Sequence, residues 1–415
     1  EIRLSLVGSE MCIRDSFNPK QARLMPDLIM PIAVLLLFMP PCMIWYAPGL
    51  MSGVYLLQKG IFLVCAYYFV RYKLFNNSYF WLLLIYLMWI IAVTIVSGNS
   101  LTEWGSYLNI FSVCVITMYC MSRAPQKYTG YVAFIFVLWM LLNTLFWKEG
   151  GMYLNSNGQM SFVLGTKTSL TYYQIVACCF IGLYEQFVDN KNKYRVTVLH
   201  VILLLSVVLW NLRQPISTSE LCIAIYFVLL VLNHIEHPFI DKIFRFGFAA
   251  TIVLNIGIVF FNAQMFFANF ITSVLHESAD LNYRTTIWKV VLTKIADNPI
   301  LGHGLNTGTH FSFDAGTSSI NQATHNFLLY LIFVGGIIGT VCFLFICMLG
   351  IRRATKKDWM IGRTLDITLI CFGLMWITEQ LKSFDMIFLC LLACVCAGET
   401  KQALVDLDEG GKVAR

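Results

Sequence analysis

The chain has 415 residues, of which 58% are hydrophobic and only 13% charged, about half the charged share of an average soluble domain. With a mean hydropathy of +0.70, this composition excludes a soluble protein with a single anchor and predicts a multi-pass membrane protein. The net charge of +6 is not accompanied by any nucleic-acid motif. We therefore interpret it as a topology signal and predict no nucleic-acid partner.

Residues 1–16 differ in character from the rest of the chain and resemble a translated adaptor sequence, so we predict that they are not native. Residues 17–415 are predicted to form one integral membrane domain. The first apolar run has no small-residue cleavage site and is expected to be a span. All fourteen cysteines except Cys12 lie in apolar runs, which argues against a disulfide framework or a cysteine metal site.

Apolar segments that approach the roughly 17–25 residues needed to cross a bilayer predict an all-α transmembrane bundle of about twelve spans. They are residues 30–46, 54–70, 79–96, 107–121, 130–147, 169–188, 196–211, 216–233, 246–261, 326–350, 364–377 and 384–397. The last two are short, so eleven spans or a re-entrant pair would also fit. Between spans five and six, the Gly- and Asn-rich residues 148–168 predict an ordered, turn-rich cap.

The distribution of Lys and Arg predicts the orientation of the bundle. If the N-terminus is cytoplasmic, most of the 29 basic residues fall in inner connections, as short cytoplasmic loops require. Both termini are then cytoplasmic. The long segment 263–325, between spans nine and ten, lies at the outer face, and we expect chemistry in this least apolar part of the chain.

Within 263–325, apolar residues recur at three- and four-residue steps, which predicts an amphipathic helix at the membrane interface. These residues are Ile287, Trp288, Val291, Leu292 and Ile295. Asn298-Pro299 should end the helix, because the residue before proline avoids helical geometry. Gly302 and Gly304 then permit a sharp turn around His303.

Two residues of this segment are the candidate catalytic groups. Arg284, just ahead of the predicted helix, can present a guanidinium fork to a phosphate; the alternative is an ordinary interfacial salt bridge. His325 opens the next span, where an imidazole could accept a proton from a hydroxyl group. The alternative for His325 is a helix cap.

Other residues are candidates for substrate binding. Arg213, in an outer connection, runs against the positive-inside bias and either pairs with Glu220 or binds an anionic group. Lys167 raises the same question. His303 either binds substrate or serves only to form the turn in which it lies. Trp288 is a candidate because it shares the segment with Arg284.

Three ionisable residues, Glu379, Lys382 and Asp385, cluster in the last outer turn. We interpret them as pairing with one another.

Three motifs stand in order along the chain: Tyr283-Arg284 with Trp288; Asn298-Pro-Ile-Leu-Gly302-His303-Gly304; and Thr324-His325-Asn326 with Gly335-Gly336 and Gly339. This combination resembles the O-antigen and capsule polymerase and O-antigen ligase superfamily of bacterial inner-membrane proteins.

The resemblance implies a metal-independent glycosyltransferase without a cofactor, acting on saccharides carried by undecaprenyl diphosphate at the outer face of the cytoplasmic membrane. Arg284 would bind the diphosphate, and His325 would orient or deprotonate the attacking hydroxyl. Arg213 is the best candidate for the family's second arginine, and Lys167 matches a basic residue before the sixth span. Chain-length regulators and flippases are candidate partners.

We prefer a polymerase of O-antigen, capsule or exopolysaccharide over a ligase that moves the glycan to a lipid core or protein. Only the acceptor separates the two. A transporter or flippase is less favoured, because such proteins need charged or broken helices near the bilayer centre, and the candidate residues here cluster outside it.

Overall fold

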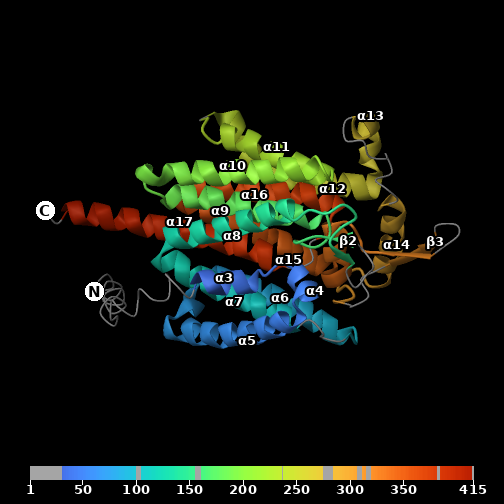
Figure 1. The fold of residues 1–415 in the computed structure, drawn as a ribbon, viewed down its shortest axis with the longest axis horizontal. Coiled ribbons are helices and arrows are strands. Elements are labelled where there is room, and N and C mark those ends of the chain that lie inside the picture. The colour runs from blue at the N-terminus through green and yellow to red at the C-terminus, as the bar shows by residue number, and fades with distance from the viewer. Residues whose placement is uncertain are drawn as a thin grey trace.

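A computed structural model describes residues 30–99, 104–154, 160–235, 237–273, 284–305, 311–314, 319–380 and 384–413. The long helices lie side by side with roughly parallel axes (Figure 1). Helices α13 and α14 and strand β3 lie at one end of this bundle, and the last part of α17 projects from the other.

The long helices are α5 (Pro48–Arg71), α6 (Ser78–Val96), α7 (Trp104–Arg123), α8 (Pro125–Leu145), α9 (Ser169–Phe187), α10 (Lys193–Asn211), α11 (Ser217–Leu232), α12 (Pro238–Phe261), α14 (Arg284–Asp297), α15 (Phe327–Lys357), α16 (Trp359–Thr378) and α17 (Asp385–Val413). Short helical pieces are α3 (Met30–Leu37), α4 (Cys42–Tyr46), α13 (Ala268–Ser273), η2 (Leu74–Asn76), η3 (Asn190–Asn192) and η4 (Ala263–Phe267). Two antiparallel strand pairs join β1 (Tyr153–Leu154) to β2 (Met160–Ser161) and β3 (Phe311–Asp314) to β4 (Ser319–Gln322).

The predicted all-α membrane bundle is confirmed. Within the described residues, eight helices are long and apolar enough to cross a membrane, and α11 is a shorter apolar helix. The number of twelve spans stays a prediction. The span expected at 30–46 is wrong as a single helix: α3 ends at Leu37 and α4 begins after Pro41, because Pro40-Pro41 cannot continue a helix.

Short connections make successive helices antiparallel and sort the basic residues to one end. Arg71 ends α5, Arg123 ends α7, Lys193 begins α10 and Lys357 ends α15. The elements of 263–325 lie at the opposite end (Figure 1). This separation matches the alternation on which the predicted orientation depends.

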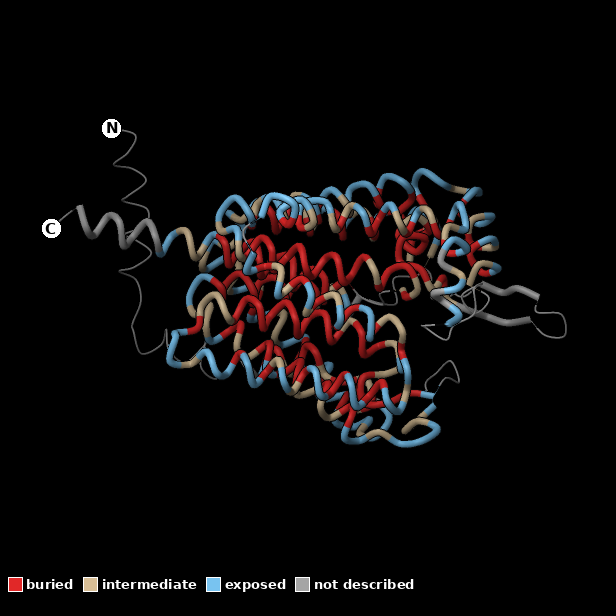
Figure 2. Tube along the Cα trace, turned by 90° about the horizontal axis from the view of Figure 1, so that it is seen from above, coloured by how far each residue is buried: buried red, intermediate tan, exposed pale blue. Residues whose placement is uncertain are grey.

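Helix α16 forms the centre of the bundle and packs against α9, α11, α12, α15 and α17. Buried residues concentrate along the inner helices, while the outermost faces are exposed (Figure 2). Many exposed residues of the outer helices are apolar, such as Leu56 and Leu63 of α5, as a surface that contacts lipid tails requires. Apolar residues therefore occupy both the interior and the surface, which explains the high hydrophobic content.

Helix α15 is broken at Gly336, whose φ of 67° and ψ of −174° are not helical. The Asn298–Gly304 turn docks against this break. The amides of His303 and Gly304 donate to the carbonyls of Phe333 and Val334 at 2.7 and 2.9 Å. Backbone groups freed inside a membrane helix must find partners within the protein, and this turn provides them.

The turn accepts hydrogen bonds from the other side of the break as well. The amide of Ile337 donates to the carbonyl of Pro299 at 2.9 Å, and that of Ile338 to Ile300 at 3.4 Å. The approach of the two backbones is so close that a Cβ atom at Gly302 would overlap the amide of Gly336. Gly302 and Gly336, which belong to different sequence motifs, therefore both permit the close contact between the turn and the break in α15.

Candidate active site

Helix α14 positions the first candidate residue. The predicted helix is confirmed, and Arg284 is its first residue rather than preceding it. Ile287, Trp288 and Val291 are buried, and α14 packs on α15. The apolar face of this helix is thus covered by protein, whereas its apolar spacing had suggested the lipid interface.

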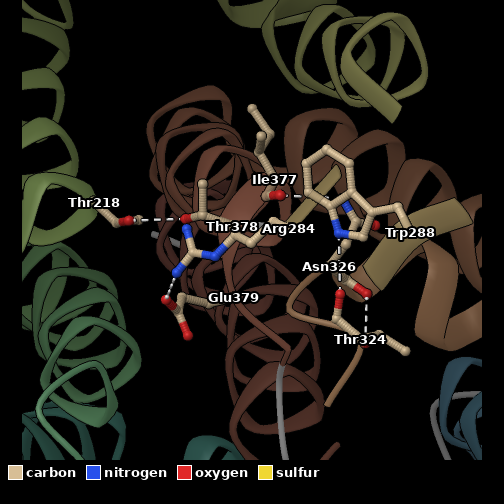
Figure 3. Close-up of polar contacts among 8 residues, drawn as sticks. All are labelled: Thr218, Arg284, Trp288, Thr324, Asn326, Ile377, Thr378 and Glu379. Atoms are coloured by element: carbon tan, nitrogen blue, oxygen red, sulfur yellow. Dashed lines mark hydrogen bonds and ion pairs between the residues drawn. The ribbon is translucent and has the colours of Figure 1, made fainter. Parts of the chain in front are cut away.

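Arg284 forms an ion pair with Glu379, the C-cap residue that directly follows α16 (Figure 3). The guanidinium Nη2 lies 3.0 Å from Glu379 Oε1, and the two side chains are 21% and 10% exposed. A half-buried arginine with one carboxylate neighbour keeps donors that can bind a further anion. The predicted grouping of Glu379 with Lys382 and Asp385 did not include Arg284; Lys382 lies outside the described residues.

The second candidate, His325, stands between two buried and well-anchored neighbours. Thr324 Oγ1 lies 2.8 Å from Gln380 Oε1 and 3.0 Å from the Asn326 carbonyl oxygen, and the Thr324 carbonyl accepts from Trp288 Nε1 at 3.0 Å. Figure 3 shows Trp288 and Thr324 beside the Arg284–Glu379 pair. The end of α16 and the start of α14 therefore meet at the Thr-His-Asn segment.

Asn326 is the N-cap of α15. Its Oδ1 accepts from the Leu329 amide at 2.9 Å, and its Nδ2 donates to Asn255 Oδ1 at 2.9 Å and to the Ile377 carbonyl at 3.1 Å. The alternative interpretation of His325 as the helix cap is thus wrong, because the neighbouring asparagine satisfies the helix end.

His325 itself is half-buried and has a φ of 45°. This left-handed conformation costs a residue with a Cβ atom about 1–2 kcal/mol. Strained residues persist where the surrounding structure over-determines them, and they concentrate at functional sites. The bonds of Thr324 and Asn326 provide that restraint, so the segment presents His325 in a fixed position.

Trp288 contributes to this arrangement through its buried indole. Trp288→Phe keeps most of the apolar volume but leaves the Thr324 carbonyl without its donor, so we expect a loss of about 1–3 kcal/mol in the free energy of unfolding. Trp210→Phe is the matched control, because Trp210 is equally buried and its Nε1 has no hydrogen-bond partner within the described part of the chain. Thermal unfolding in detergent measures both, and equal losses would contradict the assigned role of the indole.

The remaining predicted site residues lie outside this contact network. His303 stacks on Phe333 with ring centroids 4.7 Å apart, and its Nε2 lies 2.9 Å from the Lys294 carbonyl. This places it in the turn that fills the α15 break. Lys167 is exposed in the turn before α9, in the predicted cap segment, where β1 pairs with β2.

Arg213 lies between α10 and α11 and is exposed. Its Nη1 donates to the Thr144 carbonyl at 2.9 Å, and its guanidinium carbon lies 5.3 Å from the centre of the Trp147 ring. Among the described residues these groups contact Arg213, and the ion pairs there do not include the alternative pairing with Glu220. Because the Trp147 ring and the Thr144 carbonyl occupy only part of the guanidinium group, most of its N–H donors are directed to solvent.

Sequence reasoning missed Gln380 and Asn255 altogether. Asn255, 0% exposed in α12, could have been flagged as a polar residue inside an apolar run. Its Nδ2 has no hydrogen-bond partner among the residues that the structure describes. Gln380 had no such signal.

The part of the chain that the structure describes contains no group of three His, Cys, Asp or Glu residues that could hold a metal ion. None of the thirteen cysteines in that part of the chain forms a disulfide.

Residues 163–344 match a family model described as O-antigen ligase. The match runs from the cap before α9 into α15 and includes Arg213, Arg284 and His325. No curated protein and no solved structure matches the chain.

Proposed function

We propose that this chain, which belongs to the O-antigen ligase and polymerase superfamily, is a polysaccharide polymerase that uses undecaprenyl-diphosphate-linked glycans. The main support is the convergence of Arg284 and the restrained His325 where α14, α15 and α16 meet. A cation for a diphosphate and an imidazole for a hydroxyl are the two groups that glycosyl transfer from such a donor needs.

In the proposed reaction, the acceptor hydroxyl oxygen attacks the first sugar carbon of the carrier-linked glycan, and the bond from that carbon to the diphosphate oxygen breaks. His325 takes the hydroxyl proton. The departing undecaprenyl diphosphate takes the electron pair, and Arg284 stabilises its negative charge, with Arg213 as the second cation. One preorganised donor of this kind is worth roughly 2.7–4 kcal/mol of barrier. We propose no metal ion or cofactor.

The proposed location follows from the two ends of the bundle. The end rich in Lys and Arg would face the cytoplasm with both termini, as the positive-inside rule requires. The site would then lie at the outer face of the cytoplasmic membrane, beside the headgroup of a carrier embedded in that leaflet. Chain-length regulators and flippases would be its partners in producing O-antigen, capsule or exopolysaccharide.

A ligase is the second candidate, because the matching family model is described by that activity. Expression of the chain in strains that lack either a polymerase or a ligase tests both. A ladder of long glycans still attached to undecaprenyl diphosphate supports the polymerase. Glycan attached to a lipid core or a protein supports the ligase, and neither product in a strain with membrane-inserted protein rejects the proposed function.

Glu379 provides a test of the anion site that does not depend on the acceptor. Because its carboxylate neutralises Arg284 at 3.0 Å, Glu379→Gln should leave a hydrogen-bond acceptor there but free the positive charge. We expect inorganic pyrophosphate to inhibit transfer at about tenfold lower concentration, about 1.4 kcal/mol. The exposed Glu220, also near the outer end, gives the matched control Glu220→Gln. Unchanged inhibition in Glu379→Gln would contradict diphosphate binding at Arg284.

A further inference from the structure

A groove lies between α3, α5 and α7, helices that pack against one another at the N-terminal side of the bundle (Figure 1). It has a volume of about 310 Å³ and an almost wholly apolar lining. Its lining residues include Ala33, Leu57, Gly60, Val64, Tyr68 and Tyr119. Such a lining cannot hold a polar substrate, but it suits a hydrocarbon chain.

The length of the groove matches one membrane leaflet. Leu57 and Tyr68, both in α5, are eleven residues apart, which corresponds to about 16 Å along a helix. The hydrocarbon core of a bilayer is about 30 Å thick. The groove therefore covers about one leaflet, on the side toward the end of α5 at Arg71.

That end of the groove carries aromatic rings and cations. Tyr68 and Tyr119 pack with ring centroids 5.1 Å apart, and both contact Tyr72 at 5.0 and 4.9 Å. The guanidinium carbons of Arg71 and Arg123 each lie 6.0 Å from the Tyr72 ring centre. Two helices thus bring two exposed arginines to the polar end of an apolar groove.

We propose that this groove binds one anionic glycerophospholipid, with an acyl chain along α5 and the phosphate headgroup at Arg71 and Arg123. Basic residues beside a groove between transmembrane helices recognise anionic headgroups. The arginines lie at the end of the bundle opposite the candidate active site, so the occupant is distinct from the carrier of the glycan. This inference does not depend on the proposed enzymatic function.

Lipid titration of the purified, full-length protein tests the proposal. Phosphatidylglycerol or phosphatidylcholine is added in detergent, bound lipid is counted by native mass spectrometry, and the Tm is recorded. A lipid that binds only the folded state raises the Tm with concentration. We expect phosphatidylglycerol to bind more tightly, and the double variant Arg71→Gln/Arg123→Gln to weaken its binding by at least about tenfold.

Two further variants separate the groove from general charge effects. A Cβ atom at Gly60 would meet none of the described residues within 4 Å, so Gly60→Leu should fold and reduce binding of both lipids by occupying the groove. Arg195, also stacked on a tyrosine ring but in α10, gives the matched control Arg195→Gln, which should bind phosphatidylglycerol as the unchanged protein does. The proposal would be overturned if Arg71→Gln/Arg123→Gln or Gly60→Leu bound phosphatidylglycerol as tightly as the unchanged protein does. It would also be overturned if Arg195→Gln weakened this binding as much as Arg71→Gln/Arg123→Gln does.

Discussion

Long glycan chains are expected to disappear when Arg284 is replaced by alanine or His325 by asparagine, while the protein still inserts in the membrane. Arg284→Ala removes the cation that would stabilise the leaving diphosphate. His325→Asn removes the imidazole but tolerates the left-handed φ of 45°, because asparagine adopts this conformation readily. We expect at least a hundredfold loss of transfer from either variant.

Complementation of a polymerase-null strain, read as a glycan ladder on a gel, measures this loss. Lys294→Ala is the matched control for Arg284, since Lys294 is an exposed cation of the same helix. His325→Ala checks the result independently: alanine, like histidine, carries a Cβ atom at this left-handed position, so the loss of activity should again follow the loss of the imidazole. Full-length ladders from Arg284→Ala and His325→Asn would reject the site.

Gly336→Ala should be the most destabilising of these substitutions. A Cβ atom at Gly336 would overlap the carbonyl of Ile300. The backbone φ of 67° at this position also disfavours any residue other than glycine. The Asn298–Gly304 turn would have to leave the break in α15, which would strand the amides of Ile337 and Ile338. We expect a loss of at least about 3 kcal/mol in the free energy of unfolding, seen as a lower Tm and poor recovery from the membrane.

Gly53→Ala is the control for this substitution. Gly53 lies inside α5, and a Cβ atom there would meet no atom of the described ranges within 4 Å. Alanine should therefore be neutral or stabilise the helix by about 0.5–1 kcal/mol. If both variants unfold at the same temperature, the docking of the turn into the α15 break does not stabilise the protein.

Most of the bundle could be predicted from sequence, because lipid imposes a simple rule. Every backbone group in the hydrocarbon must be paired within the protein, and a helix pairs nearly all of them within its own segment. An apolar run of sufficient length therefore favours a helix whatever its neighbours are. The helix from Arg284 to Asp297 was predictable for a related reason, since its apolar spacing and Asn298-Pro299 are local signals. The hairpin of β3 and β4 was missed, because two four-residue strands carry little periodicity.

The candidate site was predicted in part. Arg284 and His325 could be identified because they belong to recognisable motifs. The glycines at 302, 304 and 336 could be identified because they belong to the same set of motifs. That those glycines meet one another was not predictable, since their contact joins a turn to a helix break across about thirty residues. Glu379 was grouped with its neighbours in the chain, although the carboxylate that contacts Arg284 lies 95 residues away.

Sequence alone was enough to identify a helical, multi-pass membrane protein with its basic residues at one end and its candidate chemistry at the other. Hydropathy and charge suffice for this, because transfer into lipid depends on the composition of each segment and not on its partners. The folded chain was needed to show which polar groups meet: Arg284 with Glu379, Trp288 with Thr324, and Asn326 with Asn255. Hydrogen bonds and ion pairs act over about 3 Å, and the packing of α12, α14, α15 and α16 alone sets those distances.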